Sequence, residues 1–408
     1  MRFPLPLTLK IARSILSHRL RGVRKFATVL QLEPLHTCNL SCTGCGRIRE
    51  YATSLKEMMP LEECLAAAAE CDAPMVSLCG GEPLLYPRIA ELVGGLRAQG
   101  RIVYLCTNAL LMRRKLRESL ASRWVRSQAR AEAVVSRLLS EELLSPEEAA
   151  AIRKPRQQPV LPAIEPSPWF YWNVHLDGLE ATHDRNVERR GVFREAIQAI
   201  RMAKHLGFQV ATNTTVYRHT DMAEIEDLLV FLGSLGVDGH TLTPGYGFAE
   251  AGREMEARHQ QRPEDYFLTR DATVNKFWFV EEWGRRYPLY GTPAYLEFLA
   301  GKRQLACSAW AIPTRNVRGW RGPCYLIADA HYASYAEMLA STDWSRFETG
   351  RDPRCEHCMV HCGYEPTASL GIGARPGDLW RNFWFQFGPR PRVKLHPVHA
   401  FNGGSSPS

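Results

Sequence analysis

The sequence predicts an α/β protein in which a TIM-like partial (β/α)6 barrel is followed by a small cysteine-rich C-terminal module. Three observations support this prediction. From residue 27 to about 245, short β-rich runs alternate with helical patterns, which is typical of parallel strands joined by crossover helices. Glycines and polar residues follow the ends of these runs, where barrel enzymes carry their reacting groups. Beyond about residue 300 the pattern changes to cysteines, prolines and tryptophans.

Six strands are expected near 28–34, 74–79, 101–107, 169–177, 208–215 and 239–244. Helical patterns fill the gaps, for example at 60–71, 193–207 and 221–236. The last two end in Gly207 and Gly236, because a left-handed residue is favoured just after a helix.

An insertion is predicted at 113–165, because the third and fourth strands lie too far apart for an ordinary connection. Its first part, 119–144, is expected to form one basic helix rich in Ala and Leu. A second helix should follow, with Ser145 as N-cap and Pro146 at its first position. The proline-rich tail of the insertion is expected to be an extended linker.

The composition is that of a globular enzyme. The chain has 408 residues and a formal net charge of +8, and no run approaches the roughly eighteen apolar residues that span a bilayer. The N-terminus lacks the apolar core of a signal peptide, so the twelve cysteines are expected to be reduced thiols or metal ligands in a cytoplasmic protein that binds no nucleic acid. The expected units are an N-terminal segment at 1–26, the barrel at 27–300, the cysteine-rich module at 301–390 and a disordered tail at 391–408.

The N-terminal segment 1–26 is basic and amphipathic. Its cations, from Lys10 to Lys25, lie among leucines and isoleucines at roughly helical spacing. Such a helix suits peripheral contact with an anionic membrane, but it also suits a helix that caps the bottom of the barrel. Both interpretations stay open at this point.

Cys38, Cys42 and Cys45 are the most informative residues, since their C-x3-C-x2-C spacing can hold three irons of a [4Fe-4S] cluster. Electron-transfer clusters take a fourth cysteine, and the next one in the chain is Cys64. The fourth iron would therefore be open to chemistry. A zinc site or three unrelated buried thiols are the alternatives.

Polar residues end the predicted strands. Gly80, Gly81, Glu82 and Pro83 follow the second one, and strand alternation puts Cys106 and Asn108, then His175 and Asp177, and then Asn213 on inward faces. A closed structural core would use branched apolar side chains there, so the pattern predicts a ligand cavity. Each residue taken alone also fits an ordinary hydrogen-bonded structural group.

The cysteine triplet, with Gly-Gly-Glu-Pro one βα unit later, resembles radical S-adenosylmethionine (SAM) enzymes. The resemblance implies that SAM binds the open iron and yields a 5′-deoxyadenosyl radical, with the Gly-Gly-Glu-Pro segment beside its methionine moiety. Further along, the cysteines after Gly319 resemble the SPASM and twitch extensions. We expect four of five thiols to bind an auxiliary iron-sulfur cluster, with zinc as the rival: Cys307, Cys324, Cys355, Cys358 and Cys362.

Longer sequence segments, including PMVSLCGGEPLLYP and CEHCMVHCGYE, resemble the HpnH family of hopanoid-biosynthesis radical SAM proteins, the adenosylhopane synthases. This resemblance implies addition of the 5′-deoxyadenosyl radical to diploptene, with electrons from a donor such as flavodoxin or ferredoxin. We expect Cys106, or else Cys79, to give a hydrogen atom to the resulting radical. The alternatives are a radical SAM enzyme that acts on a peptide or another small molecule, and a metal-binding protein without enzymatic activity.

Overall fold

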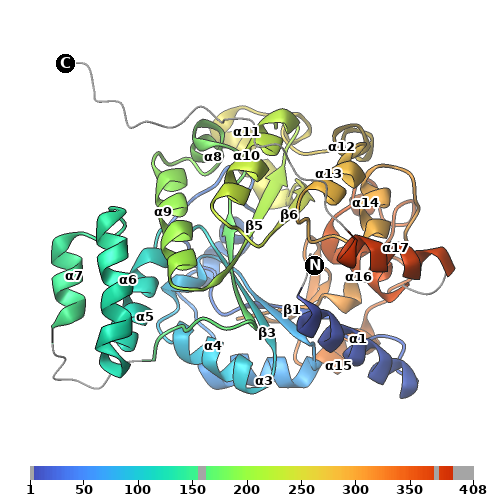
Figure 1. Ribbon diagram of the computed structural model, residues 1–408. Coiled ribbons are helices and arrows are strands. Elements are labelled where there is room, and N and C mark those ends of the chain that lie inside the picture. The colour runs from blue at the N-terminus through green and yellow to red at the C-terminus, as the bar shows by residue number, and fades with distance from the viewer. Residues whose placement is uncertain (1–3, 155–161, 372–375, 389–408) are drawn as a thin grey trace.

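The computed structural model describes residues 4–154, 162–371 and 376–388. Its centre is one nine-stranded sheet with the order β6-β5-β4-β3-β2-β1-β7-β8-β9 (Figure 1). Neighbouring strands from β6 to β7 are parallel, and β7, β8 and β9 pair antiparallel. The strands are β1 (Val29–Glu33), β2 (Met75–Leu78), β3 (Ile102–Thr107), β4 (Phe170–His175), β5 (Gln209–Val216), β6 (Gly239–Pro244), β7 (Thr314–Asn316), β8 (Gly319–Pro323) and β9 (Ala328–Tyr332).

The crossover helices cover the outer face of the curved sheet, and further helices lie near both ends of the chain (Figure 1). They are α1 (Leu5–Leu20), α2 (Arg47–Glu50), α3 (Leu61–Cys71), α4 (Ile89–Ala98), α5 (Met112–Arg126), α6 (Gln128–Ser140), α7 (Pro146–Arg153), α8 (Glu180–Asn186), α9 (Val192–His205), α10 (Met222–Ser234), α11 (Ala249–His259), α12 (Arg270–Phe277), α13 (Val280–Arg286), α14 (Pro293–Leu299), α15 (Tyr335–Ser341), α16 (His361–Leu370) and α17 (Pro376–Phe387). All six predicted barrel strands are confirmed within two residues.

The main core lies between the sheet and the crossover helices. Strand side chains that point outward are apolar and buried, and Trp172 on β4 is one of the two largest wholly buried side chains. Its ring packs edge-on against Phe170 and Phe208, with ring centroids 5.1 and 5.8 Å away. The outer face therefore supplies the hydrophobic stabilisation, which leaves the inner face free for polar groups.

The C-terminal module does not stand apart from the barrel. Strand β7 continues the sheet beside β1, with Glu33 opposite Asn316, and the β8–β9 hairpin extends it further. Sequence reasoning missed these strands because β8 reads Gly-Trp-Arg-Gly-Pro, which lacks the alternation of a strand with one apolar face.

The described part of the insertion after β3 contains three helices that stand out on one side of the barrel (Figure 1). The prediction of one helix over 119–144 is wrong, because Ser127 adopts an extended conformation (φ −162°, ψ 92°) and separates α5 from α6. The N-cap prediction is confirmed, since Ser145 and Glu148 form a reciprocal capping box. Much of the predicted linker and the tail at 391–408 lie outside the described residues.

Helix α1 covers the amino-terminal end of the barrel. Leu7 is completely buried and packs with Ile102, Tyr104, Tyr171 and Ala211. The capping interpretation of this segment therefore holds for one face of the helix. Among the described residues, no helix has both the length and the apolar content of a membrane span. Gly207 and Gly236 have φ values of 78° and 75°, as expected after helices α9 and α10.

Candidate functional site

The inner face of the barrel is polar at the carboxyl ends of its strands. Parallel register brings Cys106 of β3 beside Asn173 of β4, and His175 of β4 beside Asn213 of β5. The Oδ1 atom of Asn173 is buried and lacks a hydrogen-bond partner among the described residues. A buried unpaired acceptor is costly unless a ligand satisfies it, so this polar inner face, called the chamber below, fits a polar ligand.

The three cysteines of the C-x3-C-x2-C motif lie on the loop between β1 and α2, at this end of the barrel. Cys38 and Cys42 contact Leu40 and Val187, so apolar side chains shield one side of the loop. The backbone N–H of Leu40 donates to Cys38 Sγ over 3.4 Å. Burial, with Glu82 and Cys45 as further negative neighbours, raises the pKa of Cys38 to about 12.

These thiols fit an iron-sulfur cluster by donor chemistry, because iron-sulfur clusters are held by soft thiolate ligands. The hydroxyl of Tyr217 lies against the same loop, since a Cβ on Gly44 would come within 2.7 Å of it. Among the described residues, no three His, Cys, Asp or Glu side chains gather as ligands of a single metal ion. The assignment of the triplet therefore depends on its spacing and surroundings.

Gly80 and Gly81 hold the segment after β2 tightly against the start of the cysteine loop. A Cβ on Gly81 would lie 2.0 Å from Thr37 O and 2.4 Å from His36 O. Two backbone bonds join the segments: Gly81 N–H to Leu35 O at 3.2 Å, and the amide of the next residue to Thr37 O at 2.9 Å. The glycines thus clamp the loop that leads into Cys38, whatever further contact they make with a cofactor.

The carboxylate of Glu82 is turned inward and organises the end of β3. It accepts hydrogen bonds from Leu84 N, Thr107 Oγ1 and Asn108 N, at 3.0, 2.9 and 2.9 Å. Burial outweighs these donors and raises its pKa to about 7. Pro83 begins the following 3-10 turn (Pro83–Leu85) and is itself buried. The side chain of Glu82 therefore positions Asn108 rather than facing the chamber.

Asn108 stands directly beside the cysteine loop. Its side-chain amide donates to Asn39 Oδ1 at 2.7 Å and lies 3.9 Å from Cys38 Sγ. This contact joins the end of β3 to the first cysteine of the motif. A polar amide at this point suits recognition of a cofactor bound beside that cysteine.

His175, Asp177 and Asn213 form a connected group at the ends of β4 and β5. The imidazole of His175 contacts Asp177 Oδ2 at 2.9 Å and Asn213 Oδ1 at 3.0 Å. Burial alone would lower the pKa of His175, but the neighbouring Asp177 carboxylate raises it. Asp177 also accepts a hydrogen bond from the backbone N–H of Thr215 at 2.8 Å. Its negative charge contributes to the raised pKa of Cys42. These residues therefore lie on the side of the chamber next to the cysteine loop.

Cys106 faces the chamber from near the carboxyl end of β3. Its Sγ lies 3.4 Å from Ser77 Oγ and 3.3 Å from Asn173 Nδ2. Burial raises the pKa of this thiol, so it stays protonated near neutral pH. Cys79, the second choice, directly follows the neighbouring strand β2, where burial and the charge of Glu33 raise its pKa well above the ordinary value.

The five cysteines of the C-terminal module share one neighbourhood. Cys324 lies close enough to the other four thiols that a thiolate at Cys324 would raise the pKa of each: Cys307, Cys355, Cys358 and Cys362. Burial is the largest cause that raises the pKa of Cys355 and of Cys358 to about 12. Backbone donors also reach this region, with Ile327 N–H donating to Cys324 Sγ at 3.3 Å. The thiols fit an auxiliary cluster, with one more cysteine than a cluster needs.

Buried Arg47 and half-buried Tyr325 join the two cysteine groups. Arg47, two residues after Cys45, donates to the backbone oxygen of Tyr325 at 3.0 Å, and its guanidinium carbon lies 3.9 Å from the centroid of the Tyr325 ring. Tyr325 directly follows Cys324 in the chain. Glu33 also pairs with Arg47, at 2.9 Å. A single hydrogen bond therefore connects the segment that follows Cys45 with the segment that follows Cys324.

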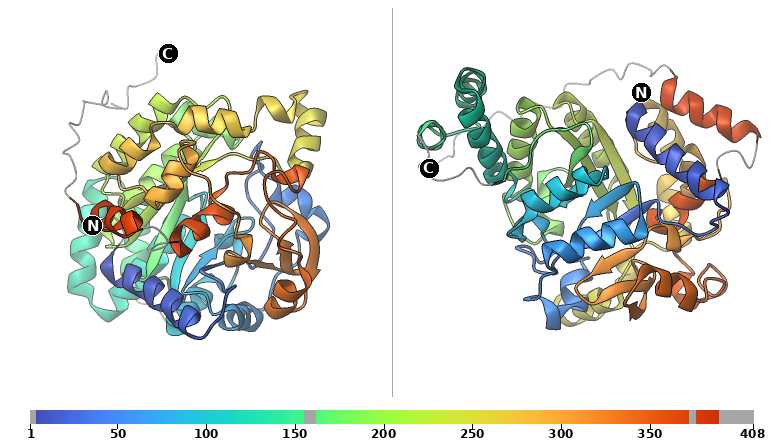
Figure 2. Two further views of the ribbon diagram at one scale, coloured as in Figure 1. Left: turned by 90° about the vertical axis from the view of Figure 1, so that its right-hand side faces the viewer. Right: turned by 90° about the horizontal axis from the view of Figure 1, so that it is seen from below.

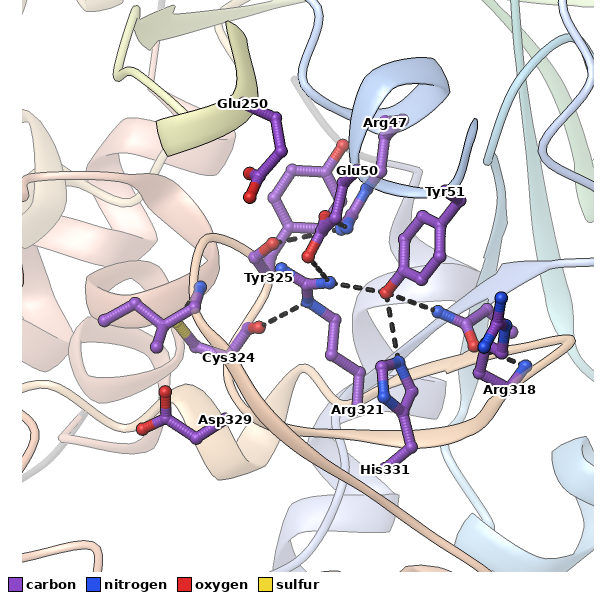
Figure 3. A network of polar contacts seen from close by, with 12 residues as sticks. Arg47, Glu50, Tyr51, Glu250, Arg318, Arg321, Cys324, Tyr325, Asp329 and His331 are labelled. Carbon is purple, nitrogen blue, oxygen red and sulfur yellow. Dashed lines mark hydrogen bonds and ion pairs between the residues drawn. The ribbon is translucent and has the colours of Figure 1, made fainter. Parts of the chain in front are cut away.

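Arg321 anchors the hairpin of the C-terminal module to α2 (Figure 3). Its guanidinium is fully buried and donates to Glu50 Oε1 at 2.6 Å, Tyr51 OH at 2.5 Å and Cys324 O at 3.0 Å. Sequence reasoning missed Arg47 and Arg321, since isolated arginines carry no pattern. The only available signal was the position of Arg47 just after the cysteine triplet.

Comparison with protein families gives two matches. Residues 32–127 match the Radical SAM superfamily, and residues 241–382 match a domain of unknown function, DUF3463. The first match covers the cysteine loop and the Gly-Gly-Glu-Pro segment. The second covers β6, the five-cysteine module and most of α17.

A curated relative is the pre-heme d1 synthase of Dinoroseobacter shibae, 21% identical over 374 residues that cover 87% of this chain and 78% of the relative. A similar solved structure is Streptococcus suis SuiB bound to its precursor peptide SuiA, with 12% identity and a TM-score of 0.51, covering 90% of this chain and 78% of SuiB. SuiB alone gives 13% identity and a TM-score of 0.50, with 90% and 79% coverage. The fold prediction is confirmed. Assignment to the HpnH family is wrong, because the similarity is to these proteins.

Proposed function

Since the chain is a radical SAM enzyme with the fold and cofactors of that class, we propose that it carries a second iron-sulfur cluster in its C-terminal module and modifies a peptide. The observation that supports this proposal is the arrangement of the two cysteine groups. The first group follows the carboxyl end of β1, and Arg47, just after it, contacts Tyr325, which directly follows Cys324 of the second group. Between them, the polar inner face of the barrel offers a chamber for the substrate.

Cys38, Cys42 and Cys45 would hold the [4Fe-4S] cluster, and the clamp of Gly80 and Gly81 would fix their loop. When bound, the cluster and SAM supply a one-electron cleavage that yields a 5′-deoxyadenosyl radical. The polar groups nearest the loop would orient SAM: Asn108, His175, Asp177 and Asn213. Pre-set positions matter, because small displacements in such a site cost large factors in rate.

A peptide suits the chamber better than diploptene does. Ser77, Cys106 and Asn173 line its floor, and the unpaired Asn173 Oδ1 needs a hydrogen-bond donor. A peptide N–H can satisfy that oxygen, whereas a hydrocarbon would leave it unpaired at a cost of about 1–3 kcal/mol. The SuiB structure, determined with a precursor peptide, adds support for this substrate class.

Cys106 is our candidate hydrogen-atom donor. Loss of a hydrogen atom from the peptide to the 5′-deoxyadenosyl radical would give 5′-deoxyadenosine and a substrate radical. When this radical takes a hydrogen atom from the Sγ–H of Cys106, it becomes a closed-shell, epimerised peptide of the same composition and leaves a thiyl radical. One electron from a donor protein such as flavodoxin or ferredoxin, with one proton from water, would restore the thiol. To test this role, Cys106→Ala should still produce 5′-deoxyadenosine but lose the epimerised peptide, whereas Cys64→Ala, outside the chamber on α3, should keep both. Normal product from Cys106→Ala would remove the assignment.

A second candidate is a reaction like that of pre-heme d1 synthase, which the sequence match over 87% of this chain favours. One anaerobic experiment separates the candidates. The reconstituted protein is reduced with dithionite in D2O in the presence of SAM, and a pooled peptide library is added while 5′-deoxyadenosine and peptide masses are followed. Incorporation of one non-exchangeable deuterium into a peptide, coupled to 5′-deoxyadenosine, supports the main proposal, whereas formation of pre-heme d1 from the relative's substrate would replace it.

Metal content supplies an independent test. We expect about eight irons and eight sulfides per chain after reconstitution. Cys38→Ala should remove about half of the iron and abolish SAM cleavage. About four irons together with one zinc would instead mean that the C-terminal cysteines hold zinc, and no 5′-deoxyadenosine from the wild-type protein would exclude radical chemistry altogether.

A further inference from the structure

We propose that the outer faces of α1 and α17 form a docking surface for an anionic lipid bilayer. This inference is independent of the substrate. Both helices carry large apolar side chains on the sides that face solvent, which is unusual for a folded domain. The views agree that the two helices are neighbours on the same side of the molecule (Figures 1 and 2).

Helix α1 has two apolar faces. Leu7 is buried on the face that covers the barrel. Leu5, Leu9, Leu16 and Leu20 are exposed by 40%, 58%, 58% and 79%. These four follow one another at spacings of four, seven and four residues, so they form a single stripe along the helix opposite to the barrel. Capping of the barrel therefore explains only half of this helix.

Helix α17 presents an aromatic stripe. Trp380, Phe383, Trp384 and Phe387 are exposed by 62%, 51%, 49% and 43%, and their three-and-four spacing places them on one side. Their rings contact one another in stacked, tilted and edge-on pairs, with centroids 5.0 to 5.8 Å apart. The opposite side is held to the protein, since Arg303 pairs with Asp378. Tryptophan is enriched at membrane–water interfaces, where one end of its ring system is apolar and the other is hydrated.

The charge around the stripes selects the partner. No Asp or Glu precedes Glu33 in the chain, whereas seven Lys and Arg residues do. In the described part of this segment Arg13, Arg19, Arg21 and Arg24 are exposed, and none forms an ion pair. Two copies of this chain would bring these cations face to face, so self-association is disfavoured. Anionic lipid headgroups complement them while the leucines enter the acyl boundary.

The test uses the full-length protein and flotation with vesicles of phosphatidylcholine, with or without about 30% of the anionic lipid phosphatidylglycerol. We expect binding to the anionic vesicles that weakens as salt is raised. The variant Leu9→Ser/Leu16→Ser/Leu20→Ser should bind at least about tenfold more weakly, because three exposed apolar anchors are removed. Its stability should stay near that of the wild type, since these side chains are exposed in the folded protein.

A matched control is Val125→Ser, which removes an exposed apolar side chain from α5 and should leave vesicle binding unchanged. Arg13→Gln/Arg19→Gln/Arg21→Gln should reduce binding about a hundredfold, from roughly fivefold for each cation. Absence of wild-type binding to anionic vesicles, or equal binding by the leucine variant, would overturn the proposal. Sedimentation that shows a dimer broken by the leucine variant, without vesicle binding, would assign the surface to a second copy instead.

Discussion

Replacement of Gly81 by alanine tests whether the glycine clamp positions the cysteine loop. The new Cβ would lie 2.0 Å from Thr37 O and 2.4 Å from His36 O, against a normal carbon-oxygen contact of about 3.3 Å. The segment must therefore move by about 1 Å, which weakens the bonds to Leu35 O and Thr37 O. Two hydrogen bonds at about 1 kcal/mol each, with about 1–3 kcal/mol of overpacking, predict a loss of about 3–5 kcal/mol.

Two measurements follow the consequence of this change. Urea unfolding of the metal-free protein reports the loss of stability, and equilibrium dialysis of the reconstituted protein should show SAM affinity at least about tenfold weaker, since Cys38 moves with its loop. Gly94→Ala in α4 is the matched control, because nothing lies within 4 Å of its added Cβ. It should stabilise the protein by up to about 1 kcal/mol. Wild-type stability and affinity in Gly81→Ala would refute the clamp.

Three further substitutions probe the framework. Burial would raise the pKa of Glu33, but Arg47 lowers it from 4.5 to about 2. The unfolded chain therefore binds this proton more tightly, and the stability of the protein falls as the pH drops from about 5 to 2. In urea unfolding at a series of pH values, Glu33→Gln should reduce that fall by about 3 kcal/mol, and the same pH dependence in variant and wild type would contradict the reasoning. Arg321→Met leaves the buried hydrogen-bond partners of Arg321 unpaired and should lower the free energy of unfolding by about 3 kcal/mol in the same measurement. An unchanged free energy of unfolding would mean that other contacts anchor the hairpin. Trp172→Ala should cost about 3–5 kcal/mol in thermal unfolding, and a loss below about 1 kcal/mol would mean a loosely packed core.

The barrel was predictable because each of its strands is a local pattern. Val29–Glu33 and Phe170–His175, for example, combine β-favouring residues with an apolar outer face that must be buried. The cysteine triplet was recognisable for a similar reason, since its three thiols lie within eight consecutive residues. Strands β7 to β9 were not, because their stability comes from pairing with β1, nearly three hundred residues earlier in the chain.

The inward residues of the site were predicted by alternation alone, but their partners were not. The sequence indicated that Cys106 and Asn108 share a face, while the contacts with Ser77, Asn173 and Asn39 depend on strand register. Glu82 shows the limit of motif reasoning. It belongs to a motif associated with cofactor binding, yet its carboxylate serves the backbone of its own fold.

The shared sheet has a consequence for attempts to divide the protein. A chain cut near residue 300 would strip β1 of its neighbour β7 and expose a row of unpaired amides and carbonyls, an edge prone to aggregation. The same cut would leave Glu33 without Asn316 opposite it. The barrel and the C-terminal module must therefore be expressed, purified and exchanged between relatives as one piece, because neither half carries a finished boundary.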